Sequence, residues 1–106
     1  MFSNNGPSNG QPRTRERGDP HVELGTLCST PGALETIDAE SIIQAIRRHR
    51  TGDWGDVCEE DKAANDQALV SEGRLVSSYL GRDGTKFWII TEADRSSTTV
   101  LLPEEY

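Results

Sequence analysis

Residues 88–99 read WIITEADRSSTT, which is two β-prone ribbons joined by a polar turn. Residues 74–80 form another β-prone run, and the Asp-Gly pair at 83–84 favours a tight hairpin turn between the two runs. The last ribbon continues to Pro103, which ends it because proline cannot donate to a ladder. The final third of the chain therefore predicts a three-stranded antiparallel meander. Its middle strand is apolar on both faces at residues 87–90, so we expect that strand to be well buried.

Two helices are predicted upstream of the meander. Residues 39–50 carry apolar side chains at helical spacing, and Asp38 is placed to cap their N-terminus. A second helix is expected to start at Asp56, because Glu59 three residues later resembles the acidic half of a capping box. Gly73 is expected to end this second helix.

Weak alternation over residues 21–28 predicts a short edge strand, followed by a turn at 29–32. Residues 1–20 are rich in Gly, Pro, Ser and Asn, so we expect them to form a disordered tail. Residues 21–106 are expected to form a single α+β domain. Its predicted fold is a three- to four-stranded antiparallel sheet with two helices packed on one face.

The chain is acidic, with a formal net charge of -7 over 106 residues. Residues 1–20 hold three arginines against two acids, so the remaining residues carry a net charge of -8. A surface of this charge repels phosphate backbones, so direct binding to nucleic acid is not expected. It suits a basic protein partner, a metal ion or simple solubility.

The cysteines and the N-terminus bear on the compartment. Cys28 and Cys58 lie far apart in the sequence and belong to no short-spacing zinc motif, although a disulfide between them stays open. The N-terminus lacks the apolar segment of a secretory signal, and no stretch approaches the length of a membrane span. We therefore expect a cytoplasmic protein with free thiols, no membrane contact and no cofactor.

The first candidate functional region lies where the two predicted helices meet. It contains His49, Asp53, Trp54 and Asp61, and residues 53–66 carry a net charge of -5. A histidine followed by carboxylates could bind a divalent metal or perform acid–base chemistry. The spacing matches no specific ligand motif, so separate structural roles for these residues stay open. Asp61 falls within an apolar helical stripe, where an acid needs a partner or a wet groove.

The second candidate region is the Asp94-Arg95-Ser96 turn of the meander. Arg95 offers a planar fork that suits a carboxylate or phosphate on a partner. Asp94 could equally cap the turn and hold Arg95 in place. Recognition of a partner and maintenance of the turn are both open for these residues.

Two blocks of sequence carry a resemblance to a known group. Residues 48–56 read RHRTGDWGD, and residues 88–106 read WIITEADRSSTTVLLPEEY. Over roughly residues 25–106 the chain resembles small bacterial proteins carried on plasmids, prophages and other mobile elements. The resemblance implies a bacterial cytosol and an accessory gene, and it implies no catalytic residue.

These observations favour a small, acidic, non-enzymatic interaction protein of a mobile genetic element. Its expected partner is a host or phage protein whose identity stays open. One specific form of this hypothesis is a partner that handles DNA or acts in defence and binds an acidic face, residues 53–66, that imitates phosphates. The alternative is a small metal-dependent hydrolase or nuclease that uses the His49–Asp53 region. A third hypothesis is a structural or regulatory subunit with no ligand, whose acidic face is simply solvated. The oligomeric state stays open.

Overall fold

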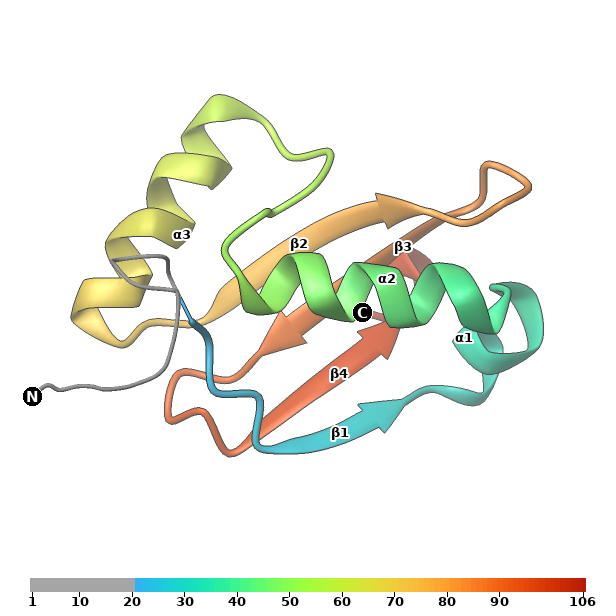
Figure 1. The fold of residues 1–106 in the computed structure, drawn as a ribbon, viewed down its shortest axis with the longest axis horizontal. Coiled ribbons are helices and arrows are strands. Elements are labelled where there is room, and N and C mark those ends of the chain that lie inside the picture. Colours follow the sequence, from blue (N-terminus) through green and yellow to red (C-terminus); the bar gives the residue numbers. More distant parts are fainter. Residues whose placement is uncertain (1–20) are drawn as a thin grey trace, which may run out of the picture.

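A computed structural model of the chain describes residues 21–106. The predicted tail, residues 1–20, lies outside the described residues. Four strands form one sheet in the order β1-β4-β3-β2, with three α-helices between β1 and β2 (Figure 1). The elements are β1 (Thr26–Ser29), α1 (Pro31–Thr36), α2 (Ala39–Arg50), α3 (Glu59–Ser71), β2 (Leu75–Leu80), β3 (Lys86–Thr91), β4 (Ser97–Leu101) and a terminal 3-10 turn, η2 (Pro103–Glu105).

The C-terminal meander is confirmed: β2 pairs with β3, and β3 with β4, in antiparallel fashion. The α+β class is also confirmed, but the expectation of a wholly antiparallel sheet is wrong at β1. This strand pairs with β4 in parallel, with Cys28 opposite Thr99. Alternation in a sequence indicates a strand but not its direction. The three helices, β2 and β3 all lie between β1 and β4 in the chain, and they form the long connection that parallel pairing needs.

Helix α2 spans Ala39–Arg50, the residues expected from the sequence. The Asp38 side chain caps it by accepting a hydrogen bond from the Ser41 amide, and it accepts another from the Arg82 amide in the hairpin turn. The Arg82 amide, and after it the Ser41 hydroxyl, which also donates to this carboxylate, hold the pKa of Asp38 down at about 2. The helix lies across one face of the sheet (Figure 1), where Ala45 joins the core with Phe87 and other residues of the inner strands.

Helix α3 begins at Glu59, three residues after the predicted start at Asp56, and Cys58 is its N-cap residue. Asp56 is used differently, because its amide donates to the Ser78 carbonyl while the Ser78 amide donates to the Trp54 carbonyl. The Asn65 side chain completes this edge by pairing with both the amide and the carbonyl of Val76. The outer edge of β2 is therefore bonded to α3 and the loop before it, which protects it from pairing with another chain.

Residues 29–32 were expected to form a turn, but Pro31 starts the short helix α1, which Thr30 caps through its hydroxyl. Proline suits the first turn of a helix, because its missing amide hydrogen has no partner to lose there. Across residues 21–106, no helix is both long and apolar enough to cross a lipid bilayer.

Candidate functional site

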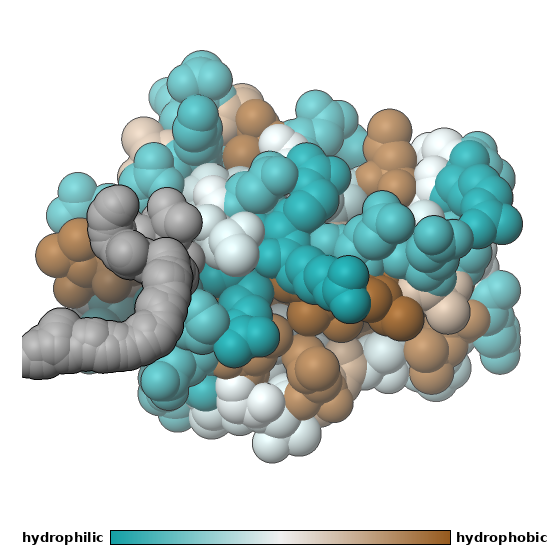
Figure 2. Space-filling model, viewed as in Figure 1, coloured by the Kyte–Doolittle hydropathy of each residue, from teal (hydrophilic) through white to brown (hydrophobic). Residues whose placement is uncertain are grey.

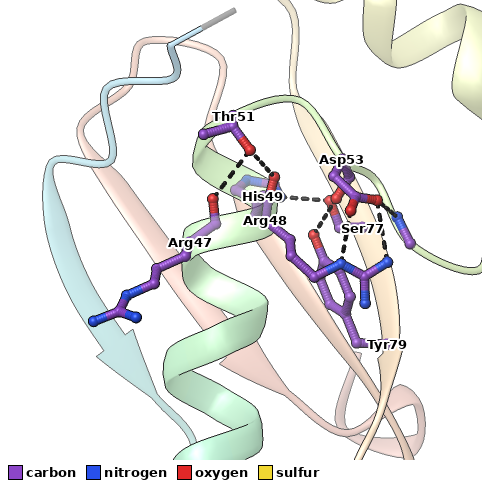
Figure 3. Close-up of polar contacts among 8 residues, drawn as sticks. Arg47, Arg48, His49, Thr51, Asp53, Ser77 and Tyr79 are labelled. Carbon is purple, nitrogen blue, oxygen red and sulfur yellow. Dashed lines mark hydrogen bonds and ion pairs between the residues drawn. The ribbon is translucent and has the colours of Figure 1, made fainter.

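His49 lies in the interior, with none of its surface exposed. Its Nδ1 is hydrogen-bonded to the Ser77 hydroxyl, and its Nε2 lies 2.8 Å from the Thr91 hydroxyl oxygen (Figure 3 shows the contact with Ser77). The Thr91 hydroxyl in turn contacts that of Thr98 at 2.7 Å, and Thr98 donates to the Leu24 carbonyl. These side chains form a polar chain from α2 across three strands, and every member of it is paired.

Burial keeps His49 neutral. Burial, and to a smaller extent the positive charge of Arg95, lower the pKa of this imidazole from 6.5 to about 4. Both ring nitrogens are occupied by hydroxyl groups. His49 is thus enclosed by protein, and its geometry is that of a structural group in the core.

Asp53 and Trp54 also have partners of their own. Asp53 forms a bidentate ion pair with Arg48, in which the guanidinium nitrogens lie 2.8 and 3.1 Å from the two carboxylate oxygens. Arg48 also lies over the Tyr79 ring (Figure 3). This ion pair lowers the pKa of Asp53. Trp54 is buried, packs edge-on against His49 and donates its indole hydrogen to Asp66. The loop after α2 is therefore bonded to α2 through Asp53 and to α3 through Trp54.

The Asp94-Arg95-Ser96 turn is tied to α3. The Arg95 guanidinium donates to the carbonyls of Ala68 and Gly73 at the end of α3, and to those of Glu92 and Ala93 in its own turn. Asp94 accepts a hydrogen bond from the Ser96 amide at 3.0 Å. In this structure Asp94 caps the turn, and Arg95 supplies the cation that the C-terminal carbonyls of a helix favour.

Asp61 lies elsewhere, in a groove on the face of the sheet that α2 does not cover. The groove has a volume of about 640 Å³, and its sheet side is formed by Val76, Ser78, Trp88 and Ile90. These residues alternate with Ser77 and Thr91, which face His49, so they point to the opposite side of the sheet. We call this feature the open-face groove.

The walls of the open-face groove differ in chemistry. Asp56 and Asp61 line it on the α3 side. Tyr106 also lines it, with its ring edge-on to that of Trp88 and the two ring centroids 5.7 Å apart. The Ser78 hydroxyl oxygen is buried and has no hydrogen-bond partner within residues 21–106, the only such buried side-chain atom in that range. The groove thus combines an aromatic surface, two carboxylates and one unsatisfied hydroxyl.

A second apolar surface lies on the other face of the molecule. Leu27 of β1, Leu34 of α1 and Ile43 of α2 each expose more than half of their surface. In Figure 2 apolar residues gather beneath α2 and above β1. This surface offers contact area, but it holds no buried side-chain atom that lacks a partner among the described residues.

The two regions singled out in the sequence meet on one helix without forming one site. Asp61 lines the groove near the start of α3, whereas Arg95 binds carbonyls at its end. In the described part of the chain, no group of three or more His, Cys, Asp or Glu side chains is arranged to hold a metal ion. Sequence reasoning missed Ser78 and Tyr106, although the apolar character of both faces of β3 pointed to Trp88 and Ile90.

No family model matches the chain, and no curated protein or solved structure matches it either. The resemblance to proteins of mobile elements accordingly stays a prediction.

Proposed function

We propose that the protein is a small acidic interaction module that binds another protein through its open-face groove. The observation that carries this proposal is the aromatic pair at the groove, Trp88 with Tyr106, on the sheet face that α2 does not cover. Tryptophan and tyrosine are enriched where proteins bind one another, because each supplies a large rigid contact area with a polar end. The groove belongs to a firm scaffold, since β2 and β3 are paired over six residues.

The acidic surface beside the groove supports a basic partner. Asp56, Glu59, Glu60 and Asp61 are exposed, and none has an ion pair within the described residues. Charges of one sign on a surface speed the approach of an oppositely charged partner and select against others. A host or phage protein that handles DNA has such a basic surface, so we propose this class of partner, in the setting of a mobile genetic element.

The proposal is tested by capture from a bacterial lysate on the immobilised full chain at rising salt. We expect the wild type and Leu34→Ser to retain the same protein, because Leu34 is exposed but lies outside the groove. Trp88→Ala and Tyr106→Ala should lose it, with circular dichroism confirming that both variants are folded. Equal retention by all four proteins would rule out the groove as the binding surface.

The class of partner is tested on the same material. Mass spectrometry of the retained protein should identify one that binds nucleic acid, and its retention should fall as salt screens the acidic face. If no protein of that class is retained even at low salt, the idea that the acidic face imitates phosphates fails.

A further inference from the structure

We propose that the open-face groove receives the side chain of an arginine from an exposed basic segment of the partner. This inference rests on the proposed function, because it names the chemistry that the groove recognises. It draws on three features of the groove, which are its aromatic surface and, among the described residues, a hydroxyl without a hydrogen-bond partner and two carboxylates without an ion pair.

The unsatisfied hydroxyl belongs to Ser78, which is 5% exposed. Its oxygen has no partner in the described chain, although buried polar side chains are bonded as a rule. The backbone of Ser78 offers no help, since its amide and carbonyl are bonded to Trp54 and Asp56. A donor supplied from outside, such as a guanidinium hydrogen, would satisfy this oxygen.

The aromatic surface lies directly beside that hydroxyl. Trp88 is the cross-strand partner of Ser78 on β3, and Ile90 is the partner of Val76. The aliphatic stem of an arginine can cover apolar surface while its charged head stays near water. The flat guanidinium also stacks on a tryptophan ring, and this contact favours arginine over lysine.

The charges at the groove favour a cation. Asp56 and Asp61 have no ion pair within residues 21–106, and a guanidinium can bind a carboxylate through two parallel hydrogen bonds. Two cations also line the groove. Arg74 is already paired with Glu92 and bonded to the Tyr106 hydroxyl. Among residues 21–106, this leaves Lys86 as the one groove cation that opposes the two acids.

The inference is tested by nuclear magnetic resonance on the isotope-labelled full chain. The probe is the capped peptide Gly-Leu-Arg-Leu-Gly, and its matched control carries citrulline, which has the shape of arginine without its charge. We expect the arginine peptide to shift the indole signal of Trp88 and leave that of buried Trp54 unchanged. The citrulline peptide should bind about ten-fold more weakly, because its ureido group still donates hydrogen bonds but lacks the positive charge that strengthens them toward a carboxylate.

Matched variants separate the groove from general attraction by the acidic surface. Asp61→Asn should weaken the arginine peptide about five-fold, whereas Glu60→Gln, the adjacent acid outside the groove, should leave binding unchanged. Ser78→Ala should weaken it about three-fold, the loss of one hydrogen bond. Equal weakening by Asp61→Asn and Glu60→Gln, or equal binding of the two peptides, would overturn the inference.

The chain's own N-terminal arginines are the competing occupant. Replacing Arg13, Arg15 and Arg17 by glutamine should leave peptide binding unchanged, and tighter binding by this variant would assign the groove to the tail. Failure of the inference differs from failure of the proposed function. If lysate capture depends on Trp88 while the arginine peptide does not bind, the groove binds a partner of different chemistry.

Discussion

Strand β2 carries two adjacent serines that point to opposite faces of the sheet, and their surroundings differ. Ser77 faces α2, and its hydroxyl is bonded to His49 at the start of a polar chain that ends at the Leu24 carbonyl. Ser78 faces the open-face groove, and its hydroxyl has no partner in the described chain. Both side chains are buried, so Ser78 does not lack a hydrogen-bond partner merely because its hydroxyl faces open solvent.

The comparison indicates which face contributes stability and which is available for binding. A buried polar network that is fully bonded makes a core specific, because any displaced member leaves others unpaired. A buried hydroxyl without a partner costs free energy, and a ligand that bonds to it recovers that cost. The α2 side of the sheet therefore stabilises the fold, and the groove side is where another molecule can add bonds.

The largest effect should follow removal of the imidazole at the centre of the polar chain. His49→Ala leaves a cavity and unpairs the hydroxyls of Ser77 and Thr91, so we expect the free energy of unfolding to fall by about 4 kcal/mol. Urea unfolding followed by circular dichroism measures it. His21→Ala is the control, because His21 is exposed, and its change should stay within about 0.5 kcal/mol. A small effect at His49 would show that the network is dispensable.

Arg95 should come second, and it decides between stability and recognition for the meander turn. Arg95→Ala removes the donors for four carbonyls, so we expect a loss of about 2–3 kcal/mol with peptide binding at the groove unchanged. Arg47→Ala is the matched control, because the Arg47 side chain extends away from its neighbours (Figure 3). If Arg95→Ala abolished partner capture while stability stayed constant, Arg95 would be a recognition residue after all.

The third prediction concerns the pH dependence of stability, which tests His49 on the α2 side of the sheet. The pKa of His49 falls from 6.5 to about 4 on folding, so the unfolded chain binds more protons between these values. The contribution of His49 to the free energy of unfolding should therefore be fully present near pH 7. The free energy of unfolding should decrease as the pH falls, by about 2 kcal/mol from pH 7 to pH 5. Urea unfolding in the His21→Ala background measures this with one histidine present. The carboxyl of Asp38, with its pKa at about 2, contributes only in a more acidic range. A flat profile above pH 5 would mean that His49 is accessible to water.

The fold could largely be predicted, because its signals are local. The Asp38 cap, the helical spacing of Ala39–Arg50 and the alternating runs of the meander each involve residues close in sequence. The direction of β1 could not be predicted, since it depends on where a long crossover returns the chain. The start of α3 was predicted three residues too early. The sequence does not reveal that the Asp56 amide pairs with the Ser78 carbonyl at the edge of β2 instead of belonging to the helix.

The candidate site was less predictable, for a physical reason. Charged and aromatic residue types identify groups that could act, but only the packing decides which of them are already satisfied. His49, Asp53 and Arg95 attracted notice by type, and each has several partners within the protein. Ser78 is inconspicuous in the sequence, and it is distinguished only by the partner that it lacks.

The smallest effect is the sharpest test of the comparison, because it uses neighbouring residues of one type. Ser77→Ala unpairs Nδ1 of His49, so we expect it to cost about 1–2 kcal/mol. Ser78→Ala removes a hydroxyl that has no hydrogen bond to lose within residues 21–106, so the free energy of unfolding should change by less than about 0.5 kcal/mol or rise. Urea unfolding of the two variants side by side decides the matter. If Ser78→Ala proves as costly as Ser77→Ala, the Ser78 hydroxyl is already bonded within the protein, and the groove has no unsatisfied group to offer a partner.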